Sequence, residues 1–149
     1  PATLYDRFLS WINGWEDYDH WVPNCEVKCI THLTGGGIPG KFGKDILFPL
    51  GLSADLPNLW APSQIMSQCA EWRSLPARQT YKTLHGGQGV LAVIAPKEVN
   101  YFCAVASRYG IETRNAGTIR DGKGNPELLL TSRFGSGEVV PFTPKDEDL

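Results

Sequence analysis

The hydrophobic and polar positions of this chain follow a helical period in some segments and an extended period in others. In the first segment Leu4, Phe8, Trp11 and Trp15 recur every three or four residues, which predicts a helix with a wide apolar face. Shorter apolar runs bounded by glycine or proline predict strands. The predicted helices are 4–15, 42–47, 63–72, 76–84 and 96–109, and the predicted strands are 26–33, 51–56, 90–95, 111–119, 127–131 and 138–142.

The order of these elements predicts an α+β fold in which a mixed β-sheet carries helices on both faces, giving three layers (α/β/α). Asp121-Gly122 and Gly135-Ser136-Gly137 are typical of hairpin turns between the last strands. No internal repeat and no linker divides the sequence. We therefore predict one domain over residues 1–143, followed by a flexible acidic tail over residues 144–149.

Composition and charge exclude several classes of protein. With 42% hydrophobic residues the 149-residue chain can bury a core, and its apolar runs are too short to cross a bilayer. The net charge of −2, with both signs mixed, provides no basic surface for nucleic acid. The four cysteines are spread along the chain without the spacing of a zinc site, so we expect reduced thiols and a cytoplasmic location.

A glycine-rich turn at residues 31–39 (THLTGGGIP) is the strongest functional signal in the sequence. A β-prone run stops at three glycines, and a proline follows where a helix can begin. Glycine permits positive φ and lets backbone amides approach an anion, although the same pattern also fits a tight turn without a ligand. Gly35, Gly40 and Lys41 match most of a P-loop, but Phe42 replaces the Mg²⁺-binding Ser or Thr, which excludes a Walker A site.

Several segments together resemble aminoimidazole ribonucleotide (AIR) synthetase, also called phosphoribosylformylglycinamidine cyclo-ligase. Residues 31–37 (THLTGGG) look like the H-I-T-G-G-G signature of that family, and residues 51–55 (GLSAD) resemble its G-L-G-A-x-I-D strand. Residues 81–89 (YKTLHGGQG) resemble its Y-R-T-F-N-x-G-x-G segment. The resemblance runs from the start of the chain to about Ile119. It covers only the C-terminal domain of a two-domain enzyme, and it implies the fold of that domain for this chain.

The resemblance implies an ATP-dependent ligase that closes the imidazole ring of AIR from formylglycinamidine ribonucleotide, in de novo purine biosynthesis. ATP and Mg²⁺ are expected for the complete enzyme and are bound mainly by the N-terminal domain, which would be present in cis or as a separate chain. We expect the present domain alone to bind neither of them, to hold no metal and to be inactive. No partner among nucleic acids or membranes is expected.

The resemblance also suggests which residues form the site. His32 is the predicted catalytic residue, because an imidazole can transfer a proton or stabilise an oxyanion. The predicted substrate-binding residues are Thr34, Gly35, Gly36, Gly37, Lys82, His85 and Gly87. Lys82 and His85 depart from the family, which usually has arginine and asparagine there, and a purely structural role fits either histidine as well.

Two other functions are compatible with the sequence. One is a non-catalytic module that binds a nucleotide or a phosphorylated metabolite, since the carboxylates of the chain are scattered rather than clustered. The other is a sister ATP-dependent enzyme of the selenophosphate synthetase or formylglycinamidine synthetase type.

Overall fold

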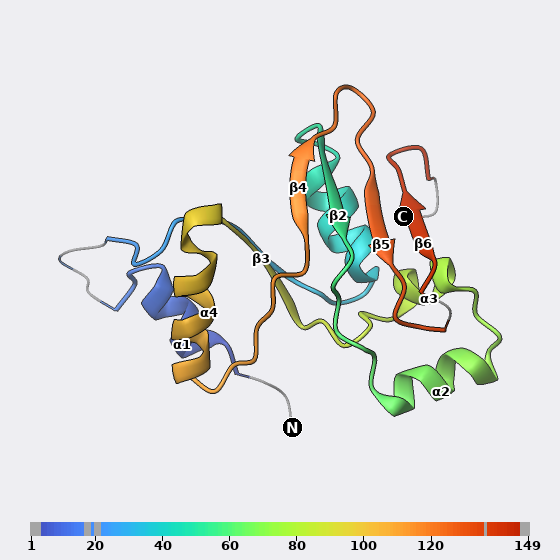
Figure 1. Cartoon of the computed structure of the whole chain (residues 1–149), viewed down its shortest axis with the longest axis horizontal. Helices are drawn as coiled ribbons and strands as arrows, with labels where there is room; N and C mark the ends of the chain where they lie inside the picture. The colour runs from blue at the N-terminus through green and yellow to red at the C-terminus, as the bar shows by residue number, and fades with distance from the viewer. Residues whose placement is uncertain (1–3, 17–18, 20–21, 136, 147–149) are drawn as a thin grey trace. The chain divides into compact units, whose positions relative to one another are not determined.

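The chain divides into two compact units in the computed structural model (Figure 1). Unit 1 comprises Pro1–Ile30 and Ala92–Asn115, and unit 2 comprises Thr31–Leu91 and Ala116–Leu149. Each unit therefore contains two separate stretches of sequence. The residues that the structure describes are 4–16, 19, 22–135 and 137–146.

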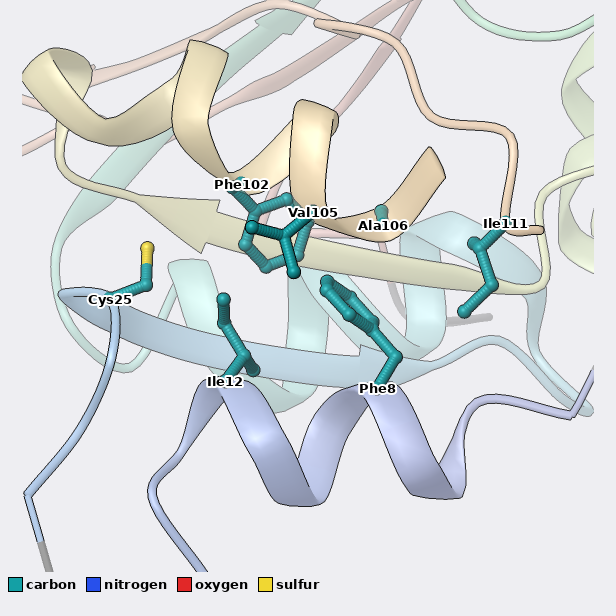
Figure 2. Packing of buried hydrophobic residues seen from close by; sticks show 7 residues of the cluster. All are labelled: Phe8, Ile12, Cys25, Phe102, Val105, Ala106 and Ile111. Atoms are coloured by element: carbon teal, nitrogen blue, oxygen red, sulfur yellow. The ribbon is translucent and has the colours of Figure 1, made fainter. Parts of the chain in front are cut away.

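Unit 1 has its core between two helices, α1 (Asp6–Ile12) and α4 (Val99–Arg108). Figure 2 shows Phe8 and Ile12 of α1 pointing toward Phe102 of α4. The rings of Phe8 and Phe102 pack edge to face with their centroids 5.0 Å apart. Burying each such side chain contributes about 1.5–3 kcal/mol to stability. The helical period of the first segment thus serves core packing at Phe8 and Ile12, whereas Leu4 and Trp15 at its two ends are exposed.

Cys25 belongs to the same core and is protonated at neutral pH. Burial, the hydrogen bond to Glu98 and the nearby negative charges raise the pKa of Cys25 to about 12. The backbone N–H of Glu26 donates a hydrogen bond to the Glu98 carboxylate, and this bond is the main cause that lowers the pKa of Glu98. All four cysteines are free thiols, as predicted.

Unit 2 is built on a four-stranded mixed sheet with the strand order β4-β2-β5-β6 (Figure 1). Strand β2 pairs antiparallel with β4 and parallel with β5, and β5 pairs antiparallel with β6. The register places Ala54 beside both Ile119 and Leu128. The strands are β2 (Leu52–Leu56), β4 (Thr118–Asp121), β5 (Leu128–Thr131) and β6 (Val139–Phe142).

The described part of unit 2 also contains three helices. The π-helix η1 (Pro39–Leu47) contacts β2 and β5, and α3 (Ala77–Thr83) contacts β6. Helix α2 (Gln64–Trp72) begins where predicted, because the Ser63 hydroxyl accepts a hydrogen bond from the backbone N–H of Met66 at 3.4 Å. No helix in the described part of the chain is long and apolar enough to cross a membrane.

The described strands also form a second sheet. It contains two strands, β1 (Val27–His32) and β3 (Val90–Ile94), and the boundary between the units falls inside each of them. The short 3-10 helix η2 (Pro96–Glu98) follows β3 and leads into α4. The α+β class and the mixed sheet are confirmed, but the strands form two sheets rather than one. The three-layer arrangement stays a prediction.

The first predicted helix is too long. Helix α1 ends at Ile12 rather than at residue 15, because Gly14 turns the chain with φ +72°. A Cβ atom at Gly14 would lie 2.1 Å from the carbonyl oxygen of Val22, so the turn needs glycine. The predicted helix starts at Leu4, whereas the observed helix begins at Asp6. Residues 1–3 lie outside the described residues.

Two predictions in the C-terminal third are wrong. The predicted strand 111–119 is not extended over most of its length, because Ile111 packs in the core of unit 1 and pairing begins only at Thr118. Asp121-Gly122 does not form a hairpin, since β2 lies between β4 and β5. The turn 135–137 does join two antiparallel neighbours, β5 and β6, although Ser136 lies outside the described residues.

The predicted tail is described only in part. Asp146 accepts a hydrogen bond from the backbone N–H of Thr143 and forms a 2.6 Å ion pair with Arg78 of α3. Partial burial opposes ionisation of this carboxyl, but these two partners outweigh burial and lower the pKa of Asp146. Residues 147–149 lie outside the described residues.

Candidate functional site

The first glycine turn begins directly after β1. Thr31 and Leu33 are buried, whereas His32 between them is exposed on the other side of the strand. The Thr34 carbonyl accepts a hydrogen bond from the N–H of Gly37 at 3.0 Å, which closes the turn. Gly36 adopts φ +90° and Gly37 adopts φ +58°. The π-helix η1 begins shortly after the turn, at Pro39, so the predicted sequence of strand, glycine turn and helix is confirmed.

Gly37 lies against the end of α3. A Cβ atom at position 37 would lie 1.9 Å from the carbonyl oxygen of Tyr81 and 3.4 Å from that of Leu84. Real Cβ atoms do not approach backbone oxygens so closely, so only glycine fits at this position. The Leu33 N–H also donates a 2.9 Å hydrogen bond to the carbonyl of Gly89. These contacts bring the two glycine-rich segments, residues 34–37 and 85–89, next to each other.

The second turn is formed by residues 85–87. Gly86 and Gly87 adopt φ +66° and +93°. The Gly87 N–H donates a hydrogen bond to Nδ1 of His85 at 3.2 Å. A Cβ atom at Gly87 would lie 2.9 Å from the carbonyl oxygen of Ala61, so the segment before α2 closes the turn from another side. Both turns therefore need glycine for two reasons, positive φ and close approach of another backbone.

The predicted site residues differ in accessibility. His32, Gly35 and Gly36 are exposed, as are Thr34 and Gly87. Gly37 is buried, and Lys82 and His85 are half-buried. Position 35 is open, since nothing lies within 4 Å of a Cβ atom built there. The exposed backbone of Gly35 and Gly36, followed by the start of a helix, is an arrangement that can bind an anion through amide N–H groups.

An ion pair between Lys41 and Asp45 lies in η1, directly after the first turn. Lys41 forms a 3.2 Å ion pair with Asp45, four residues further along η1, while Phe42 is buried. The Lys41 side chain is thus partnered within its helix. In the part of the chain that the structure describes, no group of three or more His, Cys, Asp or Glu side chains could hold a metal ion.

Sequence reasoning missed two buried residues beside the second turn, Tyr81 and Gln88. Tyr81 is fully buried, and its hydroxyl oxygen accepts a 2.8 Å hydrogen bond from the backbone N–H of Arg133. Its ring packs edge to face on Phe134 with the centroids 5.3 Å apart. Gln88 is 3% exposed. A large polar side chain inside a glycine cluster, directly before a strand, is the signal that could have indicated Gln88.

Replacing Tyr81 by phenylalanine tests how firmly this end of α3 is anchored. We expect Y81F to lower the free energy of unfolding by about 1 kcal/mol at pH 7, because the N–H of Arg133 loses its acceptor. Burial raises the pKa of Tyr81, so its neutral form stabilises the fold below about pH 10 and this contribution is lost as pH rises through the raised pKa. Y81F should therefore also lose less stability than the wild type in alkaline solution. Urea denaturation at neutral and alkaline pH measures both effects.

The control is Tyr101→Phe, since Tyr101 is an exposed residue of α4. We expect this variant to match the wild type at neutral pH. Equal stability of Y81F and Y101F at neutral pH would contradict the anchoring role of the Tyr81 hydroxyl.

Comparison with known proteins supports the resemblance seen in the sequence. A phosphoribosylformylglycinamidine cyclo-ligase of Myxococcus xanthus is 29% identical over 106 residues, which are 70% of this chain and 30% of that enzyme. One from Anaeromyxobacter sp. (strain Fw109-5) is 30% identical over 99 residues, 66% of this chain and 28% of the enzyme. A Streptomyces fradiae protein provisionally given the same name is 30% identical over 97 residues, covering 64% of this chain and 52% of that protein.

These matches confirm the resemblance to the AIR synthetase family. No family model matches the chain. The matched segment spans about half of the Streptomyces fradiae protein and less than a third of the other two relatives.

Proposed function

We propose that this chain is the C-terminal domain of an ATP-dependent phosphoribosylformylglycinamidine cyclo-ligase and binds formylglycinamidine ribonucleotide. The observation that carries this proposal is the joining of the two glycine-rich turns, one beginning after β1 and the other ending before β3, through Gly37 and Leu33. The cyclo-ligase relatives support the reaction type through their names. Their matched segments are 28–30% of their length, which leaves room in those enzymes for a separate ATP-binding domain.

In this proposal the first turn binds the phosphate of the ribonucleotide. The exposed amides of Gly35 and Gly36 and the start of the following helix provide partial positive charge without a side chain. Thr34, Lys82, His85 and Gly87 contribute further contacts to the same substrate. Backbone amides held by a rigid turn bind an anion without reorganising, which favours affinity and orientation.

His32 is the proposed catalytic residue. When bound at its own domain, Mg·ATP supplies the phosphoryl group that converts the formyl oxygen of the substrate into a leaving phosphate. The internal amidine nitrogen then attacks the formyl carbon, the C–O bond breaks, and AIR, ADP and phosphate result. His32, exposed at the end of β1, would take up the proton released during ring closure or hydrogen-bond the activated oxygen.

Isothermal titration calorimetry of this chain with formylglycinamidine ribonucleotide tests the proposal. We expect binding of the ribonucleotide, no binding of ATP and no turnover by the chain alone. Gly36→Ala should weaken ribonucleotide binding about tenfold, because positive φ strains the alanine backbone and changes the turn. The matched control is Gly124→Ala, which imposes similar strain at φ +81° in the turn after β4.

The outcomes separate the alternatives. Equal loss of affinity in G36A and G124A would contradict a binding role of the first turn. Binding of other phosphorylated metabolites with the same affinity would support the non-catalytic module instead. Turnover by the chain alone would contradict the proposed division of the active site between two domains.

A further inference from the structure

Gln88 is buried with hydrogen bonds at both ends of its carboxamide. Its Oε1 accepts a 2.6 Å hydrogen bond from the backbone N–H of Trp60. Its Nε2 donates to the carbonyl oxygens of His85, at 3.3 Å, and Gly86. An N–H donor faces the oxygen and two carbonyl acceptors face the nitrogen, so the orientation of the amide is fixed by its partners.

These bonds hold the turn at residues 85–87 in one shape. The carbonyl of His85 also accepts a 3.3 Å hydrogen bond from the backbone N–H of Gln88. On another side of the turn, the carbonyl oxygen of Ala61 lies close to Gly87. Because Trp60 and Ala61 are consecutive, the Gln88 side chain connects the turn to the same segment that closes it.

Because the turn is fixed, the hydrogen-bonding role of each ring nitrogen of His85 is fixed as well. Nδ1 of His85 accepts a hydrogen bond from the N–H of Gly87 at 3.2 Å. A ring nitrogen that accepts a hydrogen bond carries no proton, so the neutral imidazole must hold its proton on Nε2. The half-buried His85 is therefore a hydrogen-bond donor at Nε2.

We propose that Gln88 is a positioning residue: it holds the 85–87 turn so that His85 donates its Nε2–H to a phosphate oxygen of the bound ribonucleotide. This inference rests on the proposed function for the identity of the ligand, but not for the tautomer of His85. The adjacent first turn supplies backbone amides, and His85 supplies one side-chain donor with defined direction. A phosphate group can accept hydrogen bonds from the backbone amides and from the His85 side chain at the same time.

The tautomer can be measured without any ligand. In protein labelled with ¹⁵N-histidine, long-range ¹H–¹⁵N correlation spectra distinguish the two neutral tautomers, and the H85N variant identifies the His85 signals among the three histidines. We expect a protonated Nε2 and an unprotonated Nδ1 in the wild type above neutral pH. In Gln88→Met, which keeps the length of the side chain without its hydrogen bonds, we expect the signals to shift toward a mixture of tautomers.

The binding measurement uses formylglycinamidine ribonucleotide and the corresponding riboside without phosphate. We expect Gln88→Met to weaken ribonucleotide binding about tenfold, while the exposed Gln64→Met control binds like the wild type. His85→Leu should show the same loss, and His85→Asn, which keeps a donor, should recover most of the affinity. Riboside binding should not change in any of these variants.

An Nδ1-protonated His85 in the wild type would overturn the proposal, and this result does not depend on whether any variant folds. Unchanged His85 signals and unchanged affinity in Q88M would overturn it as well. If the ribonucleotide does not bind the wild type but Q88M changes the His85 tautomer, the positioning by Gln88 stands and the proposed function fails.

Discussion

Replacing Gly37 by alanine is expected to lower the free energy of unfolding by about 3–5 kcal/mol, because a left-handed backbone and a steric clash coincide there. The backbone has φ +58°, and the new Cβ atom would lie 1.9 Å from the carbonyl oxygen of Tyr81. This oxygen belongs to helix backbone and cannot move away like the end of a side chain. Relief of the clash requires that the first glycine turn move away from α3, which would also separate the two glycine-rich turns.

Gly35→Ala is the matched control for this prediction. It lies two residues earlier in the same turn, is exposed and has open space around its Cβ position. We expect its stability within about 0.5 kcal/mol of the wild type, as for most surface substitutions. Urea denaturation followed by circular dichroism compares the three proteins. A G37A protein as stable as G35A would show that the turn does not pack against α3 in solution.

Replacing His32 by alanine should reduce kcat of cyclo-ligase turnover about 100-fold or more, the typical contribution of a proton-transfer group. The measurement needs the catalytically complete enzyme, in which this domain acts with its ATP-binding domain. His32 is exposed and its neighbours Thr31 and Leu33 carry the burial of this part of β1, so the variant should fold normally. We expect KM for the ribonucleotide to change by less than about threefold, since the role is confined to the transition state.

Lys28→Ala serves as the control on the same strand. Lys28 is exposed four residues before His32 and forms an ion pair with the exposed Glu26, so its loss should leave turnover unchanged. Turnover by H32A close to that of K28A would remove His32 from the catalytic residues. A rise of KM without a fall of kcat would assign it to substrate binding instead.

Local patterns predicted most elements of the fold well. The runs at 26–33, 51–56, 90–95, 127–131 and 138–142 each lie within one or two residues of an observed strand. Ser63 and Pro76 mark helix starts because their local chemistry is sufficient: a hydroxyl that accepts a backbone N–H, and a ring that fixes φ. The glycine turn after β1 follows from the same kind of local signal.

Pairing between distant segments could not be predicted in this way. Asp121-Gly122 has the composition of a hairpin turn, and only the insertion of β2 between β4 and β5 decides against it. The register of β2 with β5 joins Ala54 to Leu128, far apart in the sequence. The contact of Gly37 with Tyr81 and the bonds of Gln88 to Trp60 are of the same kind. The glycine turns of the candidate site could be predicted from the sequence, whereas the contacts that hold them could not.

Each unit consists of two stretches that lie far apart in the sequence, and this delays folding of the chain during synthesis. When the ribosome has released residues up to Leu91, Phe8 and Ile12 still lack α4, and β2 still lacks both of its neighbours. Neither core can close early, since closure of long loops must precede the contacts that stabilise them. The nascent chain therefore exposes apolar surface from both units until its last third emerges, and this period is when it depends most on chaperones.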